Sequence, residues 1–219
     1  FNDAFSVFVD VMGDYREDGI VSYQLAIYTR IIGAYYPSIV GAANVIQAAG
    51  VATLEAPPYI ARMRYPAYYR DVILRITSAR DVDPLLMMSL IRHESLFNAY
   101  ATAAADEKGL TQVIPGTGEY IAGQLNWPNY QHSDLFRPYA SVEFGAYYLA
   151  EQLQRFNGNV YAALSGYNAG PGRAISWMEL SGGDPDRFMS AITISSTRTY
   201  IQRIYGSYNI YRELYGRSQ

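Results

Sequence analysis

The chain of 219 residues contains no cysteine, only two histidines and no long uncharged apolar run. Without cysteine it has no disulfide bond and no thiolate metal site. His93 and His132 are too few for an ordinary zinc site, and we expect neither a metal nor a cofactor. No segment approaches the length of a transmembrane helix, and no charged-then-apolar signal segment begins the chain. The first residue is Phe rather than Met, so we expect a fragment or a processed product.

Positive charge is also scarce, because the formal net charge is −3 at pH 7. Nucleic-acid-binding proteins usually present a basic face, so nucleic acid is not an expected partner. Half of the residues are hydrophobic, which is enough to bury a full core. The abundant residue is tyrosine, with 22 copies. A tyrosine ring has an apolar body and a polar tip, which suits both helix packing and sugar-binding grooves; we expect most of these rings to serve packing.

Residues 84–95 are predicted to form a helix with a glutamate at the end of an apolar stripe. Asp83 is a suitable N-cap, and Pro84 suits the first helical position, where a missing N–H costs nothing. At 3.6 residues per turn, one stripe of this helix is made by Met87, Leu90, Ile91 and Glu94. The apolar members predict that the stripe faces the interior.

Glu94 is therefore a candidate catalytic acid. A buried carboxylate either finds a partner or stays protonated because burial raises its pKa. A carboxylic acid that is still protonated near neutral pH is what proton donation to a leaving group requires. From this stretch alone, a glutamate that merely emerges at the helix end or pairs with a nearby arginine is favoured over a catalytic one. His93 points about 100° away from Glu94, so we interpret it as a surface or supporting residue.

The rest of the pattern is helical almost throughout and predicts an all-α fold. Residues 4–49 fit two or three antiparallel helices, one of which places Leu25, Tyr28 and Ile32 on one face. Prolines at 57–58 and 66 mark a linker. Further helices are expected over 67–79, from Pro115, over 138–156, 160–167 and 171–180, and from about 197, where Ser195 or Ser196 is the expected cap. At most a small β-ribbon is expected near 100–114.

Several motifs occur in a fixed order along the second part of the chain. They are Glu94-Ser95-x-Phe97-Asn98, Gly109-Leu110-x-Gln112-x-x-Pro115-x-Thr117, Pro138 through Gly145-x-x-Tyr148-Leu149, Gly166-Tyr167-Asn168-Ala169-Gly170-Pro171-Gly172, and Thr197-Arg198-x-Tyr200. Together they resemble the lysozyme-like catalytic domain of the soluble lytic transglycosylases, of the glycoside hydrolase family 23 type. The resemblance implies a catalytic domain over 65–219. It also implies that the helical segment over 1–64 is the end of a superhelical array.

The resemblance implies non-hydrolytic cleavage of the β-1,4 bond between N-acetylmuramic acid and N-acetylglucosamine in peptidoglycan. Glu94 would act first as acid and then as base, and the substrate's own acetamide would stabilise the positive intermediate. The substrate-binding residues that it implies are Gln112, Ile114, Tyr167, Asn168 and Tyr200. Tyr167 would lie near Glu94 and help to hold it, while Ser95 would bond to backbone at the helix end.

Some positions depart from the family pattern. Thr111 and Ile114 stand where methionine is common, and we expect both to wall the groove. Ala103 stands where serine is frequent, Ser196 where a glutamate is frequent, and residues 106–108 replace a small, glycine-rich stretch. None of these changes removes Glu94. The acids Asp106, Glu107 and Glu119 are interpreted as solvated charges of a loop or helix start.

Two other functions stay open alongside the transglycosylase. One is a hydrolytic muramidase of the same fold, and the other is a catalytically silent peptidoglycan-binding module. In each case the expected partner is the peptidoglycan glycan strand. We expect the protein to work outside the cytoplasm, in the periplasm or cell wall, because that is where this substrate lies.

Overall fold

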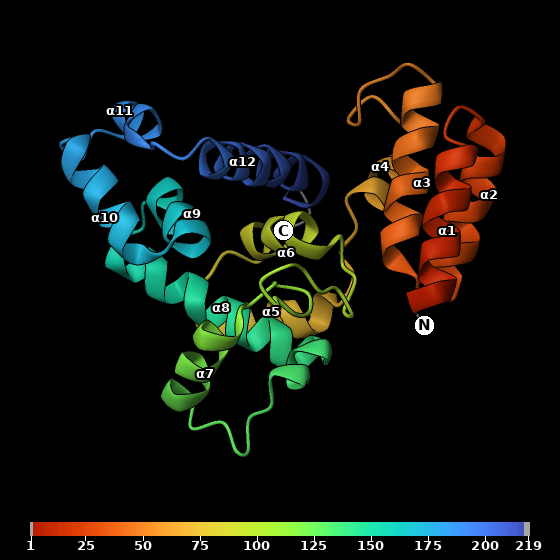
Figure 1. Cartoon of the computed structure of the whole chain (residues 1–219). Helices are drawn as coiled ribbons and strands as arrows, with labels where there is room; N and C mark the ends of the chain where they lie inside the picture. Colours follow the sequence, from red (N-terminus) through yellow and green to blue (C-terminus); the bar gives the residue numbers. More distant parts are fainter. Residues whose placement is uncertain (1, 217–219) are drawn as a thin grey trace.

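A computed structural model of the chain describes residues 2–216 and is built from helices (Figure 1). In order these are α1 (Asn2–Asp14), α2 (Gly19–Ile31), α3 (Tyr35–Ala48), α4 (Pro58–Arg64), α5 (Arg70–Ala79), α6 (Pro84–Ser95), α7 (Pro115–Gln124), the 3₁₀ helix η1 (His132–Phe136), α8 (Pro138–Arg155), α9 (Val160–Ala169), α10 (Pro171–Leu180), α11 (Pro185–Ala191) and α12 (Ser195–Tyr215). Within this described range the only β-pairing is two isolated bridges, Thr102 with Lys108 and Lys108 with Val113. The predicted all-α fold is confirmed, and near 100–114, where at most a small ribbon was expected, the pairing consists of these two bridges.

Helix α6 is the centre of the larger part of the molecule. The Asp83 side chain accepts hydrogen bonds from the backbone N–H groups of Leu85 and Leu86, at 2.7 and 3.4 Å, and Pro84 occupies the first turn. These contacts fix the start of the helix, as the sequence predicts. Buried residues cover more of its surface than the predicted stripe alone: Leu86, Met87, Met88, Ser89, Leu90 and Ile91.

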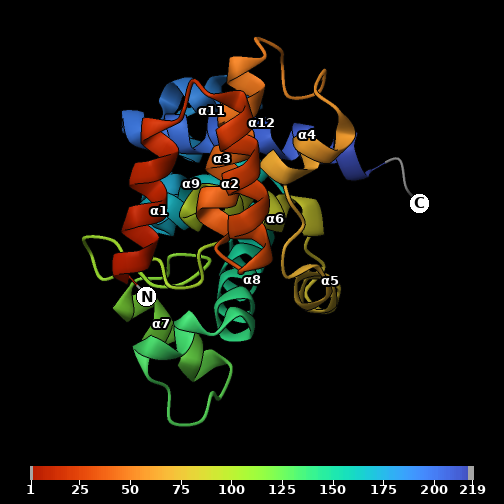
Figure 2. The same cartoon turned by 90° about the vertical axis from the view of Figure 1, so that its right-hand side faces the viewer.

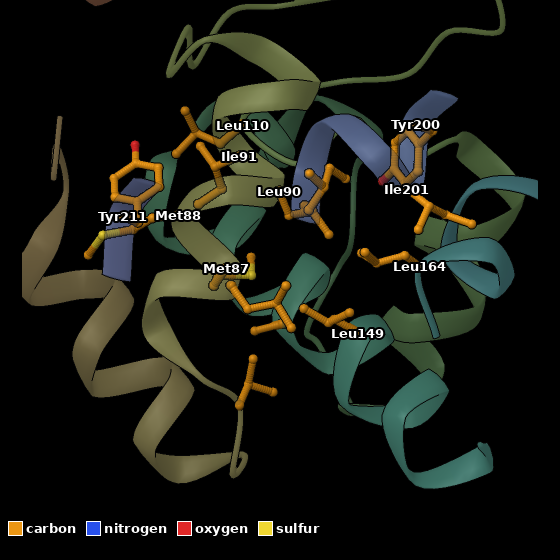
Figure 3. Packing of buried hydrophobic residues seen from close by; sticks show 14 of the residues in the cluster. Met87, Met88, Leu90, Ile91, Leu110, Leu149, Leu164, Tyr200, Ile201 and Tyr211 are labelled. Atoms are coloured by element: carbon orange, nitrogen blue, oxygen red, sulfur yellow. The ribbon is translucent and has the colours of Figure 1, made fainter. Parts of the chain in front are cut away.

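The core around α6 is formed by α8, α9 and α12. Figure 3 shows part of this core, including Leu90 of α6, Ile201 of α12, Leu149 of α8 and Leu164 of α9. All four side chains are fully buried. Burial of each such side chain contributes about 1.5–3 kcal/mol, so the helix that carries Glu94 is held firmly.

The helices α1, α2 and α3 pack together at one end of the molecule, on the right of Figure 1, and Figure 2 looks directly at them. The face of α2 that carries Leu25, Tyr28 and Ile32 is not its buried face, because Tyr28 is 55% exposed and Ile32 49% exposed. Small residues of α2, among them Ala26, face α3 instead. Gly41 explains this choice: a Cβ atom there would lie 2.8 Å from the Ala26 Cβ, so the two backbones approach too closely for large side chains.

The N-terminal helices are attached to the rest of the molecule by aromatic and polar contacts. Ile39 of α3 belongs to the main core cluster, and the Tyr35 ring stacks on Tyr68 with 3.8 Å between centroids. From α4, Arg62 donates a hydrogen bond to the Leu214 backbone oxygen at 3.1 Å. The division at residue 64 coincides with the end of α4 and stays a prediction.

Several predicted boundaries were wrong. The proline-rich linker contains the short helix α4, because Pro57 and Pro58 occupy its cap and first turn. Helix α5 begins at Arg70 rather than 67, after Tyr69 adopts a left-handed backbone with φ 55°. Helix α9 continues to Ala169. Helix α12 begins at Ser195, so neither Ser195 nor Ser196 is its cap.

Candidate active site

The end of α6 is tied to the loop that follows it. Leu96 takes a left-handed conformation with φ 48° and ends the helix. Ser95 Oγ contacts the Ile91 backbone oxygen at 3.2 Å and the Leu110 backbone oxygen at 2.9 Å. The backbone-bonding role predicted for Ser95 is thus observed. This contact holds the returning loop against the helix end, directly beside Glu94.

Glu94 is a half-buried acid whose carboxyl group meets a cavity. The Tyr200 hydroxyl donates a hydrogen bond to Glu94 Oε1 at 2.5 Å. Burial raises the pKa of Glu94 from 4.5 to about 7; the Tyr200 hydrogen bond opposes this rise, and the charge of Glu107 adds to it. The result is a carboxyl group that is largely protonated below pH 7 and able to ionise above it.

Tyr167 lies close to Glu94 but bonds elsewhere. Its hydroxyl donates to the Thr111 backbone oxygen at 2.9 Å, and its ring lies 5.2 Å from that of Tyr148. Burial, with the nearby charge of Glu94, raises the pKa of Tyr167 well above its ordinary value. Direct contact with the Glu94 carboxyl group comes instead from Tyr200, which sequence reasoning assigned to substrate.

Tyr200 lies behind the acid rather than on the lining of the groove. Its side chain is only 5% exposed, and the His93 ring packs edge-on against it at 4.9 Å. His93 is half-buried, and burial lowers its pKa. The supporting position expected for His93 therefore arises through its contact with Tyr200.

Three other predicted site residues lie around the acid. Gln112 has a left-handed backbone, and its side-chain NH₂ group donates to the backbone oxygens of Ala101 and Gly109 at 3.1 and 2.8 Å. Its side-chain oxygen is therefore the group left for a ligand. Asn168 accepts a hydrogen bond from the Thr197 hydroxyl at 2.8 Å, and Ile114 is 43% exposed.

Two adjoining cavities share Glu94, Ala103 and Gln112 and together form a groove across the end of α6. The first, of about 520 Å³, is also lined by Glu107, Val113, Ile114, Thr117, Tyr148, Tyr167, Asn168, Ala169, Gly170 and Arg173. The second, of about 590 Å³, includes Val9 and Asp10 of α1 and Tyr36 of α3. The N-terminal helices therefore contribute one wall of the groove.

The structure changes the interpretation of two positions at which the sequence departs from the family pattern, Thr111 and Ser196. Thr111 does not wall the groove as expected, because it is fully buried and its hydroxyl donates to the Ser141 backbone oxygen at 2.8 Å. It packs where a Cβ atom on Gly145 would come within 2.5 Å. Ser196 is exposed and is absent from the lining of both cavities.

Sequence reasoning missed two charged residues that line the first cavity of the groove. Glu107, interpreted as a solvated loop charge, lines the same cavity as Glu94, and Arg173 lies on that lining too. Their placement depends on how the loop after α6 folds back and on the turn at Gly170, which has φ 89°. The helical periodicity of the sequence does not indicate that either Glu107 or Arg173 lines the cavity.

A third cavity of about 710 Å³ lies where the end of α5 meets α8. Its Arg80 forms an ion pair with Glu143, and its Glu151 accepts a hydrogen bond from Tyr120. Because both charged groups already have protein partners, we do not propose this cavity as a catalytic or binding site. Within residues 2–216, no group of acids and histidines is arranged to bind a metal ion, and no helix is suited to cross a bilayer.

Comparison with known proteins finds similarity over the part of the chain that contains Glu94 and the first cavity. Residues 71–189 match the family model described as the transglycosylase SLT domain. A soluble lytic murein transglycosylase of Salmonella typhimurium is 31% identical over 159 residues, which cover 71% of this chain and 25% of that protein. The chain therefore spans about a quarter of the length of this relative.

Solved structures give the same result. The 70 kDa soluble lytic transglycosylase of Escherichia coli superposes with a TM-score of 0.77 at 27% identity, covering 89% of this chain and 30% of that one. A lytic transglycosylase of Pseudomonas aeruginosa superposes with a TM-score of 0.74 at 25% identity over 89% of this chain and 30% of that one. The latter is described as an inactive mutant in which a glutamate is replaced by glutamine.

Proposed function

The chain belongs to the transglycosylase SLT domain family, and from this premise we propose that it is a peptidoglycan lytic transglycosylase. It would cleave the β-1,4 bond between N-acetylmuramic acid and N-acetylglucosamine and form 1,6-anhydromuramoyl ends. The observation that carries the proposal is the acid Glu94, half-buried at a groove and with a pKa raised to about 7. This is the protonation behaviour that one residue needs to donate a proton and later accept one.

In the first step Glu94 donates its proton to the glycosidic oxygen. The bond between that oxygen and C1 of the muramoyl residue breaks, and the N-acetylglucosamine side leaves as an alcohol. Positive charge develops at C1, and the muramoyl acetamide oxygen bonds to it. Because the substrate supplies this group, the step requires no protein nucleophile.

In the second step the ionised Glu94 acts as base. It takes the proton from the C6 hydroxyl of the muramoyl residue, and the C6 oxygen bonds to C1 as the acetamide oxygen departs. Glu94 returns to its protonated state, and no water is consumed. The Tyr200 hydroxyl, 2.5 Å from Oε1, stabilises the ionised form that exists between the two steps.

The other groove residues would bind the glycan strand. We assign the Gln112 side-chain oxygen to a sugar hydroxyl or amide N–H, because its NH₂ group is already bonded to backbone. Ile114 offers an exposed apolar wall, and Tyr167 and Asn168 form the opposite side on the last turn of α9. Tyr200 would position the acid rather than touch the sugar.

The proposed function also implies where the protein acts and what its N-terminal helices do. Its substrate lies outside the cytoplasm, so we propose action in the periplasm or cell wall, without nucleic acid as a partner. The helices of residues 1–64 would be the last part of a superhelical array that precedes the catalytic domain. Their contribution to the groove, through Val9, Asp10 and Tyr36, supports a role beside the glycan strand.

Mass spectrometry of the products released from purified peptidoglycan sacculi tests the function. The wild-type chain should release muropeptides with anhydro ends, and Glu94→Gln should release none, because an amide cannot donate the proton. Glu179→Gln is a matched control, since this glutamate is exposed on α10. If the wild type binds sacculi but releases nothing, the chain is a binding module. If Glu94→Gln releases as much as an active wild type, Glu94 is not the acid. Either result refutes the proposal.

A further inference from the structure

Glu107 is a second carboxylate in the groove that holds Glu94. Both side chains line the cavity of about 520 Å³. Glu107 is half-buried, whereas its neighbour Asp106 is exposed and ion-paired with Lys108. Glu107 therefore differs from the other acid of this loop in facing the groove.

The loop holds Glu107 in a defined position. The Ala103 N–H donates to the Glu107 backbone oxygen at 3.2 Å, and the Asp106 N–H donates back to the Ala103 oxygen at 3.1 Å. Asp106 has φ 60°, as in a tight turn. Inside this turn the Ala105 N–H donates to Glu107 Oε2 at 2.8 Å. One carboxylate oxygen thus accepts a hydrogen bond from the backbone of its own loop.

The negative charge of Glu107 acts on Glu94, and no ion pair of the described residues includes Glu107. It contributes to the raised pKa of Glu94, after the larger effect of burial. Lys108, the nearest cation in sequence, pairs with Asp106 instead. Across the part of the chain that the structure describes, none of the ion pairs includes Glu107.

We propose that Glu107 is a second catalytic carboxylate, which activates a water molecule and gives this groove a hydrolytic branch beside the transglycosylation. The inference rests on the proposed function, because both branches start from the same protonation by Glu94. A pair of carboxyl groups, one acid and one base, is the arrangement that hydrolysis of a glycosidic bond commonly uses. The family resemblance implies a single catalytic glutamate, so the role proposed for Glu107 goes beyond what the resemblance implies.

The hydrolytic branch departs from the proposed mechanism after the first step. Glu107 takes a proton from a water molecule, and the water oxygen bonds to the muramoyl C1 as the acetamide oxygen departs. The product carries a hydroxyl group at C1, that is, a reducing end. Glu107 then releases its proton to solvent while Glu94 regains one, so the net reaction consumes one water molecule. The C6 hydroxyl remains free.

Product analysis of Glu107→Gln tests the inference. Glutamine is nearly the same size and keeps an oxygen that can accept the Ala105 N–H bond, so the turn should be preserved. Asp106→Asn is the matched control, because it makes the same change of charge on the same loop away from the cavity lining. Mass spectrometry distinguishes the two products, since reducing-end muropeptides are heavier than anhydro ones by one water molecule.

The wild type and Asp106→Asn should both release a mixture of reducing-end and anhydro muropeptides. In Glu107→Gln the share of reducing ends should fall at least about tenfold while anhydro products persist, as expected when a general base is removed. Wild-type products with anhydro ends only, or an unchanged reducing-end share in Glu107→Gln, would overturn the hydrolytic branch but leave the transglycosylase intact. Absence of any released product would instead overturn the proposed function.

Discussion

Replacing Glu94 with glutamine should stabilise the folded protein at alkaline pH and have little effect at acidic pH. Burial disfavours the ionised carboxylate, which is why the pKa of Glu94 rises from 4.5 to about 7. Below pH 4.5 the group is protonated in both the folded and unfolded chains, so nothing is lost. As the pH rises toward 7 the unfolded chain ionises first, and the folded state loses relative stability.

The size of this effect follows from the two pKa values. One pKa unit corresponds to about 1.4 kcal/mol, so the change from 4.5 to about 7 corresponds to about 3 kcal/mol. The free energy of unfolding of Glu94→Gln, relative to wild type, should therefore increase by about 3 kcal/mol between about pH 4 and about pH 8. The neutral amide carries no such penalty at any pH in this range.

Urea-induced unfolding at several pH values, followed by tryptophan fluorescence, measures this difference. Trp177 is buried in the main core and reports its loss. Glu179→Gln, at an exposed glutamate, should run parallel to the wild type across the pH range. If Glu94→Gln also runs parallel, the carboxyl group ionises as easily in the folded chain as in the unfolded one, and the argument for a buried proton donor is refuted.

Two further perturbations test the site and the packing. Activity should fall as the pH rises through about 7. In the wild type the Tyr200 hydrogen bond lowers the pKa of Glu94, so Tyr200→Phe should raise this pKa and move the fall in activity to higher pH. Turnover should also drop about tenfold, measured as muropeptide release across a pH series. Gly41→Ala should destabilise the protein by about 1–3 kcal/mol in thermal unfolding, since its Cβ would lie 2.8 Å from that of Ala26, whereas Gly13→Ala, which meets nothing within 4 Å, should not.

The backbone architecture was largely predictable because local signals agree with the tertiary packing. Asp83 and Pro84 place the start of α6, and the apolar spacing places its buried stripe. The same signal, Asp184 followed by Pro185, begins α11, where the Asp184 side chain accepts from two backbone N–H groups. That helix was absent from the sequence interpretation although its cap could have revealed it.

The contacts of the site depend on distant parts of the chain, and sequence spacing does not report them. Tyr200 reaches Glu94 across 106 positions, and Glu107 faces the acid because of the turn that follows Ala103. The buried face of α2 also depends on a partner, since Gly41 of α3 decides how closely the two helices approach. In each case the position of the side chain is determined by a residue distant in sequence rather than by the local sequence pattern.

Glu94 and the loop that carries Glu107 differ in how deeply their supporting residues are buried. Glu94 stands on the most enclosed helix of the molecule, so almost any change beneath it would disturb the whole interior. The stretch from Thr102 to Asp106 is open to solvent and supports no core residue. If Glu107 is the base of a hydrolytic branch, substitutions in this exposed stretch would change which nucleophile completes the reaction and leave the proton donor in place.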